Sequence, residues 1–235
     1  MKKLRIDVWS DIACPWCFVG KRRLEAALAK FAHREAVEII WRAFELDPSA
    51  PRERNSTVSY AARIAQKYGS SVAEAEGMIT RMKDVAASDG LDFRFDKIRP
   101  GNTFDAHRVL HLAGERGKQD AVKERFLRAY MTEGEPIGDP ETLVRLAGEA
   151  GLDPEEVRAV LASDAHVKDV RADEQEAGEL GITGVPFFVF GEKYAVSGAQ
   201  SAEVLLGALE RAWAQQASLP VVFAEGAACG PEGCA

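Results

Sequence analysis

The feature that most constrains this chain is a pair of cysteines, Cys14 and Cys17, separated by a proline and a tryptophan. Residues 4–8 alternate apolar and polar side chains, which predicts a β-strand. Residues 20–30 are typical of a helix, so the two cysteines lie where a strand gives way to a helix N-terminus. Pro15 fits the first turn of that helix, where its missing N–H would have no partner in any case.

This position favours an anion. The unpaired N–H groups and the positive end of the helix dipole stabilise negative charge at a helix N-terminus, and the anion available here is the thiolate of Cys14. The thiolate, not the thiol, is the nucleophile in disulfide exchange. Two intervening residues also allow Cys14 and Cys17 to close a small disulfide.

Two other interpretations of the pair are a half-site for zinc and a purely structural disulfide. The sequence contains no second Cys-x-x-Cys and no Cys/His pair with the spacing of a zinc finger. Disulfides closed over two residues are strained and seldom serve only as staples. We therefore interpret Cys14 and Cys17 as a redox-active dithiol.

The composition limits the classes of function and the cellular compartment that we expect. The chain has 235 residues, of which 46% are hydrophobic and 29% charged, and its formal net charge is −7. A negative net charge argues against sequence-independent binding to nucleic acid, because such binding needs a basic face on the protein. We expect no secretory signal and no membrane span, because no suitable apolar run follows the N-terminal lysines or occurs elsewhere. We therefore expect a cytoplasmic protein, in which cysteines are more often catalytic or metal-binding than structural.

A second strand is predicted over residues 37–46. Its residues are apolar on both faces, which favours a central strand. Strand, helix and strand together predict a right-handed βαβ unit with parallel strands.

The stretch from about residue 56 to residue 180 is almost entirely helical in pattern, with six or seven helices. Ser71 begins a capping box, and Asp139 and Asp153 each precede a proline that suits a first helical turn. Residues 102–103 are expected to cap a helix that runs to Glu115. Such a block does not continue a βαβ alternation, so it is interpreted as an insertion.

Strands return near the C-terminal end. Residues 185–190 and 194–197 predict a β-hairpin closed by a tight turn, and residues 201–214 predict a final amphipathic helix. The order βαβ, helices, ββα predicts an α/β fold with a central mixed sheet. We divide the chain into a discontinuous domain of residues 1–55 and 181–216, an inserted helical subdomain of residues 56–180, and a tail of residues 217–235.

Several segments together resemble a known family. They are Asp11-Ile12-Ala13-Cys14-Pro15-Trp16-Cys17, Asn102-Thr103-Phe104-Asp105-Ala106-His107-Arg108, Gly184-Val185-Pro186 and Ser197-Gly198-Ala199-Gln200. With the order of elements, they resemble the DsbA-type branch of the thioredoxin superfamily, and within it the cytoplasmic FrnE group. The resemblance covers about residues 4–214 and implies a thioredoxin-like fold. The C-terminal Cys229-x4-Cys234 resembles the tail of a Deinococcus member of that group.

The resemblance implies roles for individual residues. Cys14 would attack substrate disulfides, and Cys17 would resolve the mixed disulfide. Pro186 would follow a cis peptide bond and face the dithiol, leaving the backbone of Val185 free to pair with a substrate peptide. Without the resemblance, Pro186 is equally compatible with an edge strand. Trp16 would either contact substrate or simply pack beside the site.

Other residues near these motifs have weaker assignments. Asp11 could assist proton transfer, although an ordinary turn former is the simpler interpretation. His107 and His111 are spaced to share one helical face and could hold a metal, but no third ligand is evident, so we predict no metal site. His107 and Gln200 are instead predicted as substrate contacts.

The tail pair Cys229 and Cys234 leaves three alternatives open. It could exchange disulfides with Cys14 and Cys17 as an auxiliary redox pair, form a stable clasp, or join the first pair around a soft metal such as zinc.

The sequence therefore predicts a protein dithiol–disulfide oxidoreductase or isomerase. It would act without a bound cofactor on protein or peptide thiols and disulfides, with glutathione as a further redox partner, as a monomer or dimer. One alternative is a glutathione-dependent isomerase or transferase of the kappa or 2-hydroxychromene-2-carboxylate type, which normally has serine near the position of Cys14. Another is a cysteine-based metal-binding scaffold for stress protection. The net direction of exchange is left open.

Overall fold

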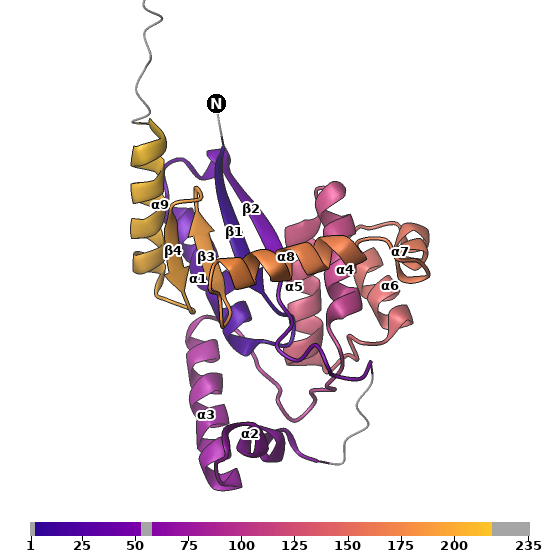
Figure 1. The fold of residues 1–235 in the computed structure, drawn as a ribbon. Helices are drawn as coiled ribbons and strands as arrows, with labels where there is room; N and C mark the ends of the chain where they lie inside the picture. The colour runs from indigo at the N-terminus through magenta and orange to yellow at the C-terminus, as the bar shows by residue number, and fades with distance from the viewer. Residues whose placement is uncertain (1–2, 53–57, 218–235) are drawn as a thin grey trace, which may run out of the picture.

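The computed structural model describes residues 3–52 and 58–217. Its strands and helices, shown in Figure 1, follow one another in this order: β1 (Leu4–Ser10), α1 (Pro15–Lys30), a 3-10 turn (Arg34–Ala36), β2 (Val37–Ala43), α2 (Tyr60–Tyr68), α3 (Val72–Ser88), α4 (Phe104–Glu115), α5 (Gln119–Arg128), a π-helical turn (Ala129–Glu133), α6 (Pro140–Glu149), α7 (Pro154–Leu161), α8 (Val167–Glu179), β3 (Phe187–Phe190), β4 (Tyr194–Ser197) and α9 (Ala202–Ala217).

Four strands form one mixed sheet in the order β2-β1-β3-β4. β1 and β2 are parallel, as the βαβ pattern predicts, and the other two pairings are antiparallel. Side chains of one face pack against α1 and α9. The opposite face carries Trp9, which packs with Ala177 of α8 and with Ile182, and in Figure 1 α8 crosses in front of the sheet. The predicted central mixed sheet is confirmed.

The prediction that the second strand is central is wrong, because β2 is an edge strand of this sheet. Helix side chains cover its outer edge. The amide of Gln119, at the start of α5, accepts from the backbone N–H of Trp41 and donates to its carbonyl, at 2.9 and 3.0 Å. Asp173 of α8 accepts from the N–H of Ala43 at 2.8 Å. The strand is apolar on both faces because helices of the insertion flank it.

The helices of the insertion begin where the capping residues predict. Ser71 and Glu74 form a capping box at the start of α3, and the carboxylates of Asp139 and Asp153 accept from first-turn N–H groups of α6 and α7. At α4 the side chain of Asn102 accepts from the N–H of Phe104 at 2.8 Å.

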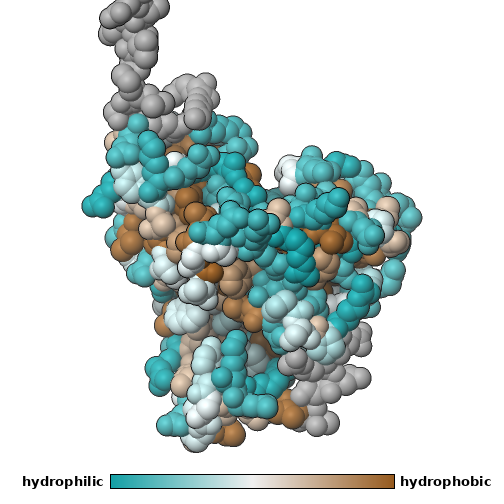
Figure 2. All heavy atoms as spheres, in the orientation of Figure 1, coloured by the Kyte–Doolittle hydropathy of each residue, from teal (hydrophilic) through white to brown (hydrophobic). Residues whose placement is uncertain are grey.

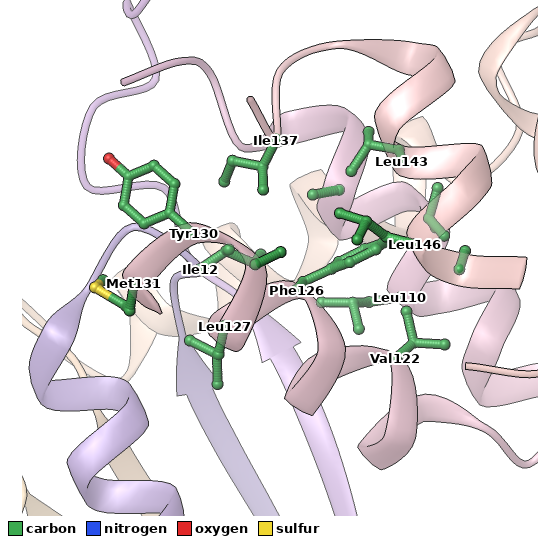
Figure 3. Packing of buried hydrophobic residues seen from close by; sticks show 14 of the residues in the cluster. Ile12, Leu110, Val122, Phe126, Leu127, Tyr130, Met131, Ile137, Leu143 and Leu146 are labelled. Carbon is green, nitrogen blue, oxygen red and sulfur yellow. The ribbon is translucent and has the colours of Figure 1, made fainter. Parts of the chain in front are cut away.

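The insertion has a core of its own that reaches the start of α1. Figure 3 shows Phe126 of α5 beside Leu110 and Leu146, and Leu127 of the same helix and Leu143 belong to the same cluster of buried side chains. Ile12, from the loop that carries the cysteines, belongs to the same cluster. The dithiol is thus attached both to the sheet and to the helical core. In the described ranges, no helix is long and apolar enough to cross a membrane.

Candidate active site

The two cysteines lie at the N-terminus of α1, as predicted. Cys14 is the N-cap residue and has extended backbone angles, Pro15 occupies the first turn, and the N–H of Cys17 donates to the carbonyl of Cys14 at 3.1 Å. Both cysteines are in the free thiol form. Cys14 is 4% exposed and Cys17 is fully buried. A substrate sulfur can therefore approach Cys14 but not Cys17, which fits an attacking and a resolving thiol.

The loop before β3 lies directly opposite Cys14. The Val185–Pro186 peptide bond is cis, as the resemblance predicts. The thiol of Cys14 donates to the carbonyl of Val185 over 3.5 Å. The nucleophile is thus next to a backbone carbonyl that an extended peptide could also use, because strand-like recognition relies on such groups.

Gly20 allows α1 to lie close to this loop. A Cβ atom at Gly20 would be 2.9 Å from Cγ of Pro186 and 3.2 Å from Cζ of Phe188. Gly20→Ala is therefore expected to destabilise the protein by about 1–3 kcal/mol, the usual cost of forcing a methyl group into a packed core. Urea unfolding measures this change.

Gly178→Ala is the matched control, since that glycine is in α8 and a Cβ atom added to it would meet open space. In a helix this control is expected to be neutral or stabilising by up to about 1 kcal/mol. Equal effects of the two substitutions would contradict a specific close approach at Gly20.

A cluster of buried polar residues lies behind the dithiol; we define it as Ser10, Asp11, His107 and Lys123. Nζ of Lys123 donates to the carbonyl of Ser10 at 3.4 Å and lies 5.6 Å from the ring centre of Trp41. Burial raises the pKa of the Cys17 thiol well above its usual value, and the neighbouring Cys14 raises it further. The positive charge of Lys123 acts in the opposite direction. Cys17 is therefore held in its protonated thiol form near neutral pH.

Asp11 and His107 form the other half of this polar cluster. Burial raises the pKa of the Asp11 carboxyl, but the His107 ring and the N–H of Leu46, which donates at 2.8 Å, lower it more. Burial lowers the pKa of His107 despite the nearby Asp11. The pair is therefore a carboxylate and a neutral imidazole near neutral pH. Asp11 also accepts from the N–H of Ala13 at 3.3 Å, so its predicted turn-forming role is present.

Cys14 opens into a groove of about 660 Å³. One wall is the cysteine loop with Trp16, which is 41% exposed, and Val185. The other wall is the arm formed by α2 and α3, with apolar side chains such as Ile64 and Met82, while Lys67 and Arg81 add positive charge. Figure 2 shows the arm projecting from the body, with hydrophobic residues reaching its surface among hydrophilic ones.

A chain of aromatic rings connects the arm to the cysteine helix. Tyr60 of α2 stacks on Phe95, Phe95 contacts Phe93 edge-on, and Phe93 stacks on Phe18 of α1, with ring centres 4.8, 5.7 and 6.0 Å apart. Arg23 of α1 also donates to Asp89, beyond the end of α3, at 2.9 Å. These contacts fix the far wall of the groove relative to Cys14.

The structure separates the predicted substrate contacts. Trp16 and Val185 line the groove. His107 is 1% exposed and lies behind the dithiol, so the prediction that it touches substrate is not supported, since it has almost no surface to offer. Gln200 is exposed but bonds to the carbonyl of Ser197 and does not line the groove. Cys229 and Cys234 lie outside the described residues, and their role stays a prediction.

No group of three or more metal-ligating side chains occurs within residues 3–52 and 58–217. Instead, Nε2 of His111 lies 3.0 Å from the carboxylate of Asp173 of α8, which also pairs with Arg42.

The sequence reasoning missed Lys123. The sequence did contain an indication of its burial, because in α5 this lysine stands among the apolar residues Val122, Phe126 and Leu127. A charged residue at a core position of an amphipathic helix is unusual unless it has a partner or a function.

Comparison with known proteins agrees with this geometry. The sequence pattern of the DsbA-like thioredoxin domain matches residues 5–210. YwbO of Bacillus subtilis is 29% identical over 192 residues, which cover 80% of this chain and 88% of YwbO.

Among solved structures, a probable DsbA oxidoreductase of Streptomyces coelicolor is 48% identical, with a TM-score of 0.86, covering 99% of this chain and 98% of that one. The cytosolic disulfide reductase DsbM of Pseudomonas aeruginosa shares the fold at 16% identity, with a TM-score of 0.58 and coverage of 91% and 98%. The match over residues 5–210, together with the cysteine pair and the cis-proline loop, shows that the chain belongs to the DsbA-like thioredoxin domain family.

Proposed function

We propose that this protein is a cytoplasmic protein dithiol–disulfide oxidoreductase or isomerase whose exchanging pair is Cys14 and Cys17. The observation that carries the proposal is the position of Cys14, at a helix N-terminus, 3.5 Å from the Val185 carbonyl and open to a groove. Cys14 attacks a substrate disulfide, or its own disulfide with Cys17 is attacked by a substrate thiolate. Cys17, buried one helical turn away, resolves the mixed disulfide.

The groove favours a polypeptide substrate. Its walls are mainly apolar and it begins at Trp16, which suits side chains flanking a cysteine in an unfolded or partly folded chain. The cis-proline loop beside it can align a peptide backbone. Protein thiols and disulfides are therefore the proposed partners, with glutathione as the small-molecule redox partner, and no bound cofactor takes part.

A narrower assignment to the FrnE group is also proposed. It rests on the motifs of residues 102–108 and 197–200 and on the Cys229-x4-Cys234 tail. The alternative of a kappa-type or 2-hydroxychromene-2-carboxylate isomerase is less favoured, because Cys14 stands where those enzymes normally have serine and a resolving Cys17 is present.

Equilibration with glutathione tests the proposed function. In the full-length protein with Cys229 and Cys234 replaced by serine, reduced and oxidised glutathione are expected to interconvert the Cys14–Cys17 dithiol and disulfide in a two-electron reaction. Acid quenching followed by mass spectrometry measures the fractions. A midpoint of about −270 mV would place the protein with reductases, and one above about −200 mV would place it with oxidants and isomerases.

The same preparation is assayed for reduction of insulin disulfides and for bound zinc. Exchange with glutathione and insulin without stoichiometric zinc supports the proposal. A protein that never exchanges but binds zinc tightly would contradict it and favour the metal-binding scaffold.

A further inference from the structure

Lys67 of α2 and Arg81 of α3 line the same groove as Cys14. Each lies among the apolar side chains with which its helix faces that groove: Tyr60, Ile64 and Tyr68 on α2, and Met78, Ile79, Met82 and Val85 on α3. An amphipathic surface helix normally carries its charged side chains on the opposite face, toward solvent. Two cations on the apolar side of these helices are therefore better explained by a ligand in the groove than by solubility.

Neither cation has a carboxylate partner in the described part of the chain. Lys67 lies 5.8 Å from the ring centre of Tyr68, whereas Arg94, in the loop after α3, pairs with Asp96. None of the described residues that line the groove is acidic, although the chain as a whole has a formal net charge of −7. The groove is thus a positively charged surface on an acidic protein, and such a surface attracts and orients anionic partners.

Cys14 is separated from this charge by only a few residues of extended chain. The groove volume of about 660 Å³ corresponds to a space about 11 Å across, which about three residues of extended peptide would span. Burial raises the pKa of Tyr60, on the same wall as Lys67, to about 12; Arg63 opposes this change, and the charge of Cys14 adds to it. The two walls are therefore close enough to influence each other electrostatically.

We propose that Lys67 and Arg81 select polypeptide substrates in which acidic residues lie two or three positions from the exchanging cysteine. This inference rests on the proposed exchange function and narrows its substrate class. Apolar side chains next to the substrate cysteine contact Trp16 and the methionines of α3, and the carboxylates beyond them pair with the two cations. Charge pairing at an exposed site acts mainly on the rate of encounter and on the choice of partner, and it weakens with salt.

Activated peptides test this selection. Each peptide has one cysteine with apolar neighbours, joined through a disulfide to 2-thiopyridine. The residues two and three positions away on both sides are all Glu, all Gln or all Lys. The enzyme is reduced full-length protein with serine at positions 229 and 234. Each rate is divided by the rate of the same peptide with 2-mercaptoethanol, which removes differences in the intrinsic reactivity of the peptides.

The reaction is followed through the group that leaves. The Cys14 thiolate attacks the peptide sulfur, and the pyridine thiolate departs, takes a proton from solvent and becomes the thione, whose absorbance gives the rate. Cys17 then displaces the peptide, which leaves as a thiol. The enzyme dithiol is thus oxidised by two electrons, and the activated disulfide is reduced by the same two.

At low ionic strength the Glu peptide is expected to react about 3–10-fold faster than the Gln peptide, the size expected for two exposed charge contacts. The Lys peptide should react more slowly than the Gln peptide. Salt at about 1 M should bring the three rates together, because the screening length falls to about 3 Å.

Substitutions on the arm make the result specific. Lys67→Gln together with Arg81→Gln is expected to bring the ratio of the Glu rate to the Gln rate close to one. Lys67→Gln together with Arg81→Glu should reverse the order, so that the Lys peptide reacts faster than the Glu peptide. A merely structural role of these side chains would not produce such a reversal.

Lys83→Glu is the matched control. It makes the same change of charge on α3, two residues from Arg81, at an exposed position that does not line the groove. It should keep the preference for the Glu peptide. Lys67, Arg81 and Lys83 are all exposed, so the variants should fold, as surface substitutions usually do.

A preference for the Glu peptide that survives in Lys67→Gln with Arg81→Gln would overturn selection by these two cations. So would a loss of preference in Lys83→Glu as complete as in that double variant, or equal rates for the three peptides with the parent. A parent that releases no thione from any peptide would count against the exchange function itself, so the two failures are distinguishable.

Discussion

Replacing Cys14 with serine is expected to abolish exchange with insulin and glutathione, lowering the rate by about a thousandfold or more, because the nucleophile of the first step is lost. A serine hydroxyl is not ionised near neutral pH and cannot form a disulfide. The rate of insulin reduction and the formation of a glutathione adduct both measure this loss.

Cys17→Ser gives the contrasting result. Cys14 can still attack, but the mixed disulfide cannot be resolved, so adducts with glutathione and with substrate proteins should accumulate on Cys14. Peptide mapping locates them. Adducts that form equally well on Cys17 in a Cys14→Ser protein would contradict the assigned order of attack, which rests on the burial of Cys17.

Asp173→Ala is expected to cause the largest loss of stability, about 3–5 kcal/mol, the usual cost of removing one partner of a buried ion pair. The Asp173 carboxylate accepts from Arg42 at 2.7 Å and from the N–H of Ala43 at 2.8 Å. Removing it leaves a half-paired guanidinium and an unpaired backbone donor. Urea unfolding at neutral pH measures the difference in free energy of unfolding.

The control for this change is Asp169→Ala on the same helix. That carboxylate is 55% exposed and pairs with His166, so its removal should cost no more than about 1 kcal/mol. Comparable losses in the two variants would show that α8 tolerates substitution poorly in general and would contradict the role given to Asp173.

Stability should also depend on pH through Asp173. Burial raises the pKa of its carboxyl, but His111, the N–H of Ala43 and Arg42 lower it more, so the folded-state pKa lies below the ordinary value. A depressed pKa contributes stability above the unfolded-state value of about 3.9, and that contribution is lost as pH falls through the folded-state pKa. The advantage of the parent over Asp173→Asn should therefore be constant near neutral pH and shrink below about pH 4. A difference that stays constant far into the acid range would contradict this interpretation.

The parts of the site that depend on short stretches of sequence were predictable. A strand, two spaced cysteines and a proline at the first turn place Cys14 at a helix N-terminus, because each signal is local. The cis bond before Pro186 followed from a family motif and not from physical reasoning, since a proline in that position also suits an edge strand.

The features that the sequence did not predict depend on contacts between segments that are far apart in the chain. Residues 37–43 are apolar on both faces whether a strand or a helix covers them, so the pattern alone did not show that β2 is an edge strand. The spacing of His107 and His111 shows a shared helical face, but not that one histidine meets Asp11 and the other Asp173. Lys123 belongs to the same class, because Cys17, whose charge it feels, is far away in the sequence.

Hydrogen bonds between helix side chains and the backbone of β2 affect which parts of this fold can be removed. An uncovered outer strand displays free N–H and C=O groups that invite pairing with another molecule. Here Gln119 and Asp173 occupy those groups at Trp41 and Ala43. A shortened variant that keeps the strands and α1 but loses the helices between β2 and β3 would expose that ladder to any extended chain. Within β2, the helical insertion thus occupies backbone groups at Trp41 and Ala43 with which another chain could otherwise pair.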